Sequence, residues 1–154
     1  MATLIVLKGD QTIAMGPVTI SRVAPGLFAA NGGGKGLAAS SVLRVKADGS
    51  RTVEAVSIYD RAQAAFIPAP LDFEPATDQL FLILYGTGIR HAGNVKCTVG
   101  GDNIEVLFAG PSPAWAGLDQ VNVRLPRFLS GRGTVDVIVT ADNQRSNVVQ
   151  VVFR

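Results

Sequence analysis

The sequence predicts an all-β protein built as a β-sandwich, and three observations lead to that fold class. Of its 154 residues, 47% are hydrophobic and only 17% are charged, which is enough apolar material for one well-filled core. The 17 glycines and eight prolines fall between short apolar runs, as turns fall between strands. Several runs alternate with a period of two, most clearly Val121, Val123 and Leu125 against Asn122 and Arg124.

The first part of the chain predicts extended structure that leads into the core. Strands are expected at residues 3–7 and 12–15, joined by a turn, with further extended chain at 18–23. Leu27 and Phe28 follow a Pro-Gly turn, and we expect both side chains to plug the core.

Glycine-rich segments mark the next turns. Four glycines within residues 31–36 predict a mobile loop, because little restrains such a backbone. The Asp48-Gly49 pair between extended runs at 42–46 and 51–57 is the strongest hairpin signal in the chain. Residues 58–66 allow either a helical turn or extended structure.

The pattern becomes regular after residue 76. We therefore expect a hairpin-rich N-terminal extension at 1–75, a linker or long surface loop at 68–77, and the sandwich itself at 76–154. The continuous apolar run at 81–85 predicts a central strand covered on both faces. Further strands are expected at residues 95–99, 104–108, 118–125, 134–140 and 147–153.

The alternation also predicts which side chains are buried. The expected core consists of Leu82, Leu84, Val95, Cys97, Val99, Ile104, Val106, Phe108, Val121, Val123, Leu125, Val135, Val137, Val139, Val149 and Val151.

Short motifs along most of the chain carry a family resemblance. They are Val23-Ala24-Pro25-Gly26-Leu27-Phe28, Asp48-Gly49-Ser50, Tyr85-Gly86-Thr87-Gly88-Ile89, Val99-Gly100-Gly101, Phe108-Ala109-Gly110-Pro111, Gly117-Leu118-Asp119-Gln120-Val121-Asn122-Val123, Leu125-Pro126 and Gly131-Arg132-Gly133. With them the chain resembles an uncharacterised C-terminal domain family of acidobacterial (Solibacter-type) extracellular proteins, which is similar to the immunoglobulin-like IPT/TIG domains. The resemblance implies an immunoglobulin-like sandwich and an extracellular or cell-surface location, and it supplies no activity or catalytic residue.

Composition bears on partners and compartment. The net charge of +2 comes from scattered lysines and arginines, whereas a nucleic-acid binder would cluster them, so no nucleic-acid partner is expected. The apolar runs are too short to span a bilayer, and no membrane insertion is expected. The start at Met1 without a leader, unlike the long secreted chains of the family, suggests an excised fragment.

The sequence offers no convincing catalytic or cofactor motif. His91 is the sole histidine and no Gly-x-Ser-x-Gly elbow occurs. Gly86-Thr87-Gly88 lacks the third glycine of a dinucleotide loop, and Gly36 stands where a phosphate loop needs Ser or Thr. Cys97, the only cysteine, lies on an apolar strand face and is expected to be a buried hydrophobe. We expect a protein that is not an enzyme and uses no cofactor.

The sequence leaves open whether a group of carboxylates binds calcium. Asp72, Glu74 and Asp78 share a segment and could offer oxygens to calcium, although their spacing matches no EF-hand and solvated turn residues are the favoured interpretation. The turn interpretation also applies to Asp102 and Asp142. Asp119, Gln120 and Asn122 match the family motif and are expected to tie a loop to a strand end.

Trp115 is the one residue with a competing functional interpretation. A loop stiffened by Pro111 and Pro113 presents it, so the indole could stack on a sugar or anchor a protein partner. The expected alternative is that the ring folds back and caps the core, because no second aromatic residue accompanies it in the sequence.

These observations favour a non-catalytic extracellular or cell-surface module that acts as a structural spacer or adhesion domain and contacts neighbouring domains or a protein partner. A second hypothesis is a self-assembling subunit joined by terminal-strand addition, which would form a homo-oligomer through strand edges. Apolar strands at residues 4–7 and 148–153 stand at the two chain ends, and a terminal strand can complete a neighbour's sheet. A third is a carbohydrate-binding module that uses Trp115.

Overall fold

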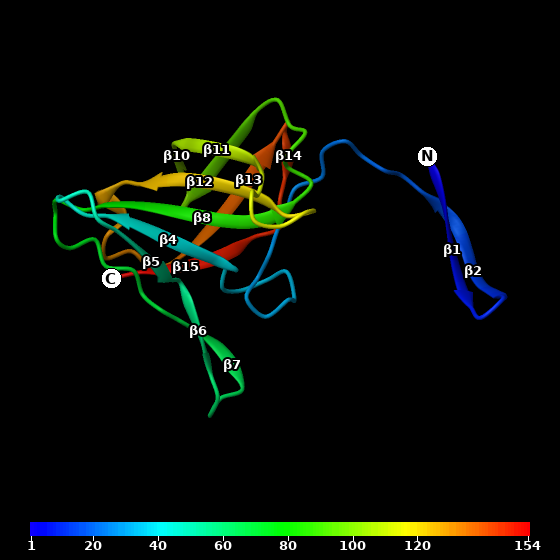
Figure 1. The fold of residues 1–154 in the computed structure, drawn as a ribbon, viewed down its shortest axis with the longest axis horizontal. Helices are drawn as coiled ribbons and strands as arrows, with labels where there is room; N and C mark the ends of the chain where they lie inside the picture. The colour runs from blue at the N-terminus through cyan, green and yellow to red at the C-terminus, as the bar shows by residue number, and fades with distance from the viewer.

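Two antiparallel sheets pack face to face, so the predicted all-β sandwich is confirmed (Figure 1). The computed structural model describes residues 1–154. The first sheet has the order β11 (Val106–Pro111), β12 (Asp119–Leu125), β8 (Gln79–Thr87), β4 (Ser40–Val45) and β5 (Arg51–Ala55), with β3 (Gly26–Leu27) also paired to β8. The second has the order β10 (Asp102–Ile104), β9 (Val95–Val99), β13 (Gly133–Ala141) and β14 (Gln144–Arg145), with β15 (Val149–Phe153) also paired to β13.

The core lies between these sheets and forms one cluster of 24 buried residues. Alternate residues of each strand point inward, as the period of two requires. Leu82 and Val123 from the first sheet and Val137 and Val151 from the second are fully buried. Between β12 and β13, the short 3-10 helix η1 (Arg127–Leu129) adds the buried Leu129.

Most of the predicted core is confirmed. Thirteen of the sixteen expected residues are buried, and Val95 and Val106 are partly buried against the cluster. Phe108 is the exception at 41% exposed, because the register of β11 shifts between Val106 and Phe108. This bulge places Phe108 opposite Asn122, on the outer face of the sheet.

The central position of β8 is confirmed, whereas its expected cover on both faces is wrong. β8 pairs with both β12 and β4. Leu82 and Leu84 are buried toward the core, while Phe81, Ile83 and Tyr85 are half-buried on the outer face. The partial exposure of these three residues shows that the outer face of β8 is in contact with solvent.

Residues on both sides of position 75 build the first sheet. β4 pairs with β8 from Ser40↔Leu84 to Val45↔Gln79, and β4 and β5 form the hairpin predicted from Asp48-Gly49. The division expected at residue 75 therefore does not follow a gap between sheets.

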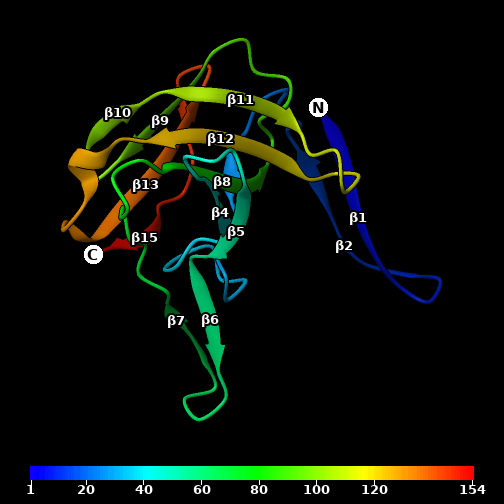
Figure 2. The ribbon, with the colours of Figure 1, turned by 60° about the vertical axis from the view of Figure 1, so that its left-hand side comes forward.

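The structure decides the alternative left open at residues 58–66 in favour of extended chain, and it corrects the expectation for residues 68–77. Residues 58–66 belong to a hairpin of β6 (Ser57–Asp60) and β7 (Ala65–Pro68), which projects from the sandwich in Figure 2. Residues 68–77 are not a loose linker, because Leu71 and Phe73 are 2% exposed and the Phe73 ring meets Phe153 edge-on at 5.4 Å.

The glycine-rich loop at 31–36 is tied down rather than unrestrained. The side chain of Asn147 accepts a hydrogen bond from Leu27 N at 2.7 Å and donates to the carbonyls of Leu27 at 2.9 Å and Gly34 at 2.7 Å. Gln150 N also donates to Gly36 O at 2.8 Å. Leu27 is buried as expected, but Phe28 is 44% exposed, since successive residues of a strand point to opposite faces.

Gly86 and Gly88 allow the chain near β3 to approach β8 closely. A side chain at Gly86 would place its Cβ 2.2 Å from Gly26 O, and one at Gly88 would place it 2.0 Å from Ala24 O. Gly88 also has a φ of +72° and its carbonyl accepts a hydrogen bond from Ala24 N. The motif is therefore a close backbone crossing rather than only a tight turn.

The N-terminal hairpin stands apart from the sandwich. β1 (Ala2–Lys8) pairs with β2 (Gln11–Val18), which confirms both predicted strands, and Figure 1 shows the hairpin well away from the two sheets. Ile5 and Met15, which pair across the hairpin, are 51% and 71% exposed. Leu4 and Val6 on the other face are 55% and 41% exposed.

Candidate functional site

The loop between β11 and β12 presents the Trp115 side chain to solvent. Its ends are joined by Ser112 N donating to Leu118 O at 2.8 Å, and Leu118 N donates back to Trp115 O at 3.3 Å. Trp115 is 71% exposed, so the expected capping of the core by its indole is wrong. These two hydrogen bonds close the loop, and Trp115 lies at its middle.

Two other aromatic residues line a hollow beside Trp115. The hollow has a volume of about 400 Å³ and is lined by Phe28, Ala39, Tyr85, Ser112, Pro113, Ala114, Trp115, Leu118 and Gln120. Phe28 follows β3, Tyr85 comes from β8 and Trp115 comes from the β11–β12 loop. Sequence reasoning found Trp115 alone, because these aromatic residues are far apart in the chain and only the sheet brings them together.

Strand register positions the polar side of this hollow. Gln120 pairs directly with Tyr85 across β12 and β8, so both side chains lie on the outer face. Gln120 Nε2 donates to Asn122 Oδ1 at 2.8 Å, two residues along the same face. The Tyr85 hydroxyl lies 3.5 Å from Ser41 Oγ on the neighbouring strand.

Asp119 anchors the end of the Trp115 loop, as the sequence predicts. Its side chain is 1% exposed and accepts hydrogen bonds from Ile89 N at 2.7 Å, Arg90 N at 3.1 Å and Arg90 Nε at 2.5 Å. The Arg90 guanidinium also donates to Leu118 O at 2.9 Å. This buried ion pair ties the turn after β8 to the start of β12. Gln120 and Asn122, expected to share this task, bond to each other instead.

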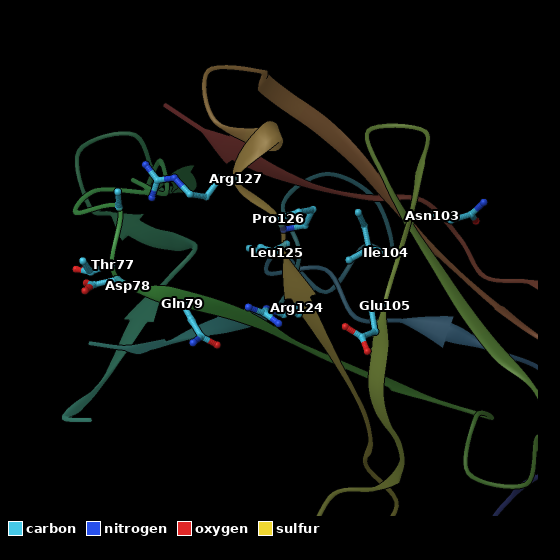
Figure 3. A pocket seen from close by; sticks show the side chains of 11 residues that line it. Thr77, Asp78, Gln79, Asn103, Ile104, Glu105, Arg124, Leu125, Pro126 and Arg127 are labelled. Atoms are coloured by element: carbon cyan, nitrogen blue, oxygen red, sulfur yellow. The ribbon is translucent and has the colours of Figure 1, made fainter. Parts of the chain in front are cut away.

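A hollow of about 600 Å³ lies at the other end of β12, and Figure 3 shows its lining side chains. Arg124 and Arg127 come from β12 and η1, while Asp78 and Glu105 face them from neighbouring segments. Arg127 donates to Phe73 O and to the Glu74 carboxylate, both at 2.5 Å. These contacts hold the 68–77 segment in place.

Arginines also engage the carboxylates considered for calcium. Asp72 contacts Arg154 at 3.0 Å, Glu74 contacts Arg127, and Asp78 contacts Arg44 at 3.4 Å. The hydrogen bond from the Glu74 N–H is the main cause that lowers the pKa of Asp72 below its usual range, and the positive charge of Arg154 lowers it further. No group of three metal-ligating side chains lies close together in the chain. Each of the three carboxylates therefore has its own cationic partner.

Arg44 is a buried cation that sequence reasoning missed. It is 7% exposed, points inward on β4 and pairs with Glu54 on β5. It also donates to Asp72 O at 2.7 Å and Glu74 O at 3.0 Å. The hydrogen bond to Glu54 raises the pKa of Arg44 further, against the effect of burial. Its place in the alternation after Val42 was the only sequence signal for an inward position.

Cys97, His91 and Asp142 agree with the structural interpretations expected of them, whereas Asp102 does not. Cys97 is 1% exposed, and burial raises the pKa of its thiol to about 12, as for a buried hydrophobe. His91 is exposed in the turn after β8. Asp142, in a turn as expected, accepts hydrogen bonds from Gly93 N and Asn94 N. Asp102 instead begins β10 and pairs with Arg132 at 2.5 Å.

Comparison with protein-family models, with characterised proteins and with solved structures returns no match. The structure contains no helix with the length and apolar character needed to cross a membrane.

Proposed function

We propose that this chain is a non-catalytic, immunoglobulin-like module of an extracellular or cell-surface protein, where it serves as a structural spacer or adhesion domain. The observation that carries the proposal is the β1–β2 hairpin. Both of its faces expose large apolar side chains, among them Leu4, Ile5, Leu7, Ile13 and Met15. A surface of this kind is suited to contact with another polypeptide.

The low stability of an isolated hairpin supports the proposal that a partner covers β1 and β2. A two-stranded hairpin is at best marginally stable in water, and it gains stability when its apolar faces are packed. The β1–β2 hairpin packs neither face on its own sandwich, as its exposure and its place in Figure 1 indicate. A neighbouring domain or adhesion partner that covers Ile5 and Met15 would supply the missing contact.

Amide hydrogen exchange tests this role by comparing two samples: the protein isolated from its native cells together with whatever is bound to it, and the 154-residue chain alone. We expect the amides of β1 and β2 to exchange slowly in the native sample and fast in the isolated chain, and those of β8 and β12 to be protected in both. Fast exchange at the hairpin in both samples would contradict the proposal, because nothing would then cover these strands.

The second candidate, a self-assembling subunit, is favoured by the same hairpin together with the free edges of β11 and β5. Sedimentation velocity on the isolated chain separates the two roles. A monomer is expected for the spacer. The self-assembly hypothesis would replace the spacer proposal if the chain forms a stable oligomer that the double variant Ile5→Asp/Met15→Asp dissociates and the single variant Val53→Asp does not. Val53 is a matched control because it is 70% exposed on β5.

A further inference from the structure

The hollow around Trp115 combines aromatic rings from three separate segments. Phe28 is 44% exposed, Trp115 is 71% exposed, and Tyr85 is half-buried with its hydroxyl toward Ser41. No ring pair forms among them, since the close ring contacts of the chain are Tyr59 with Phe66 and Phe73 with Phe153. The three rings therefore do not stack on one another, and Phe28 and Trp115 keep much of their surface exposed.

Polar groups in the hollow are also free to bind. The side-chain hydrogen bonds there join Gln120 Nε2 to Asn122 Oδ1, Ala114 N to Ser112 Oγ, and the Tyr85 hydroxyl to Ser41 Oγ at 3.5 Å. They leave the Trp115 indole N–H as a donor, the Gln120 side-chain carbonyl as an acceptor, and the Tyr85 hydroxyl with capacity for a further hydrogen bond. No charged residue lines the hollow.

We propose that this hollow binds a neutral oligosaccharide. Sugar rings present C–H faces that pack on aromatic side chains, and their hydroxyl groups both donate and accept hydrogen bonds. The uncharged lining disfavours an anionic ligand, which would lose hydration without gaining a counter-charge. The volume of about 400 Å³ lies in the range of about 300–1,000 Å³ of small-molecule sites.

A proline-rich peptide fits the same aromatic residues less well. Proline lacks an N–H, so such a peptide offers carbonyl acceptors but few donors. It could accept from Trp115 and Tyr85, yet it would leave the Gln120 carbonyl unpaired and desolvated, which costs binding energy. A sugar hydroxyl can satisfy that carbonyl.

The loop geometry favours a preformed site. Asp119 fixes the start of β12, and Pro111 and Pro113 restrict the backbone that leads to Trp115. A ligand would therefore need to order few residues on binding, which lowers the entropic cost. This inference is independent of the hairpin role proposed above, and it can fail while that role stands.

Because Trp115 is the only tryptophan, its fluorescence reports directly on the hollow. The probes are cellohexaose, xylohexaose, mannohexaose and hexa-N-acetylchitohexaose, with decaproline and polygalacturonate as contrasting ligands. We expect at least one neutral oligosaccharide to shift the emission to shorter wavelength and to protect it from iodide. Calorimetry should show at least a tenfold loss of affinity in Trp115→Ala and in Gln120→Ala.

The control variant is Tyr59→Ala, which removes an exposed aromatic ring on β6 and should leave affinity unchanged. The proposal is overturned if none of the four neutral oligosaccharides binds, or if Trp115→Ala and Gln120→Ala bind as the unaltered chain does. A response to decaproline alone would reassign the hollow to a peptide, and a response to polygalacturonate alone would reassign it to an anion.

Discussion

Replacing Arg44 by alanine should be among the most damaging single substitutions in the chain. The Arg44 guanidinium is the only cation in contact with Asp78, whose side chain is 3% exposed. It also holds two carbonyls of the segment that follows β7, at Asp72 and Glu74. The substitution therefore leaves a buried carboxylate and two carbonyl groups without their partner.

The structure sets the size of the effect. Removing one partner of a buried ion pair costs about 3–5 kcal/mol. The lower part of that range applies, because the Glu54 side chain is 32% exposed and can be hydrated once Arg44 is gone. We expect a loss of about 3 kcal/mol in the free energy of unfolding.

Urea denaturation followed by far-UV circular dichroism measures this loss, with Arg124→Ala as the matched control. Arg124 is exposed on β12, and its replacement should cost less than about 0.5 kcal/mol. Arg44→Ala combined with Asp78→Asn should recover part of the loss, because no buried charge is then left unpaired. A loss below about 1 kcal/mol for Arg44→Ala alone would refute the argument that this guanidinium is needed where it lies.

Four further outcomes follow from single contacts. Val123→Ala should cost roughly 1–3 kcal/mol in urea denaturation, because it leaves a cavity in the core, and equal losses for Val123→Ala and Arg124→Ala would show that the register is wrong. Gly88→Ala should lower the melting temperature, since its Cβ would overlap Ala24 O, and an unchanged melting temperature would contradict the close crossing. Asn147→Asp, which keeps the acceptor and loses both donated hydrogen bonds, should cost about 1–3 kcal/mol in the same denaturation assay. Cys97, with its thiol pKa raised to about 12, should stay protonated at pH 8 and react with Ellman's reagent only after unfolding, so labelling of the native chain would contradict its burial.

Local sequence patterns predicted the parts of the fold that local physics determines. The Asp48-Gly49 turn adopts a positive φ of 82° at Gly49 and joins β4 to β5, as a short hairpin requires. The alternation along β12 fixed which of its side chains are buried, because a strand with one covered face has only one suitable register. Asp119, singled out by its motif, does tie a loop to a strand end.

The sequence-based predictions of burial are wrong where contacts with distant segments of the chain determine the structure. Phe108 keeps the expected spacing from Val106, yet the bulge between them turns its side chain outward. Leu71 and Phe73 sit among prolines and carboxylates that indicate a surface loop, but β15 and Arg44 give that segment backbone and side-chain partners. Neither contact leaves a periodic signal in the sequence.

Trp115 shows the same limit at the candidate site. A lone tryptophan in a sequence is best interpreted as a core cap, because exposing a large ring with nothing beside it is unfavourable. The β12–β8 register brings Tyr85 and Gln120 beside it, and β3 adds Phe28. The exposed indole therefore has aromatic and polar neighbours, and together they line one hollow.

The β1–β2 hairpin and the Trp115 hollow differ in chemistry, and that difference predicts different occupants for them. The β1–β2 hairpin exposes Ile5 and Met15 side by side on one face, and the backbone groups between its two strands are paired, so an apolar protein surface that packs on this face buries no unpaired polar group there. The Trp115 hollow places the indole N–H and the Gln120 carbonyl among its rings, so a dry cover would bury both without partners. A hydroxyl-rich ligand avoids that cost. One module can therefore be held by its hairpin while its hollow stays open to solvent.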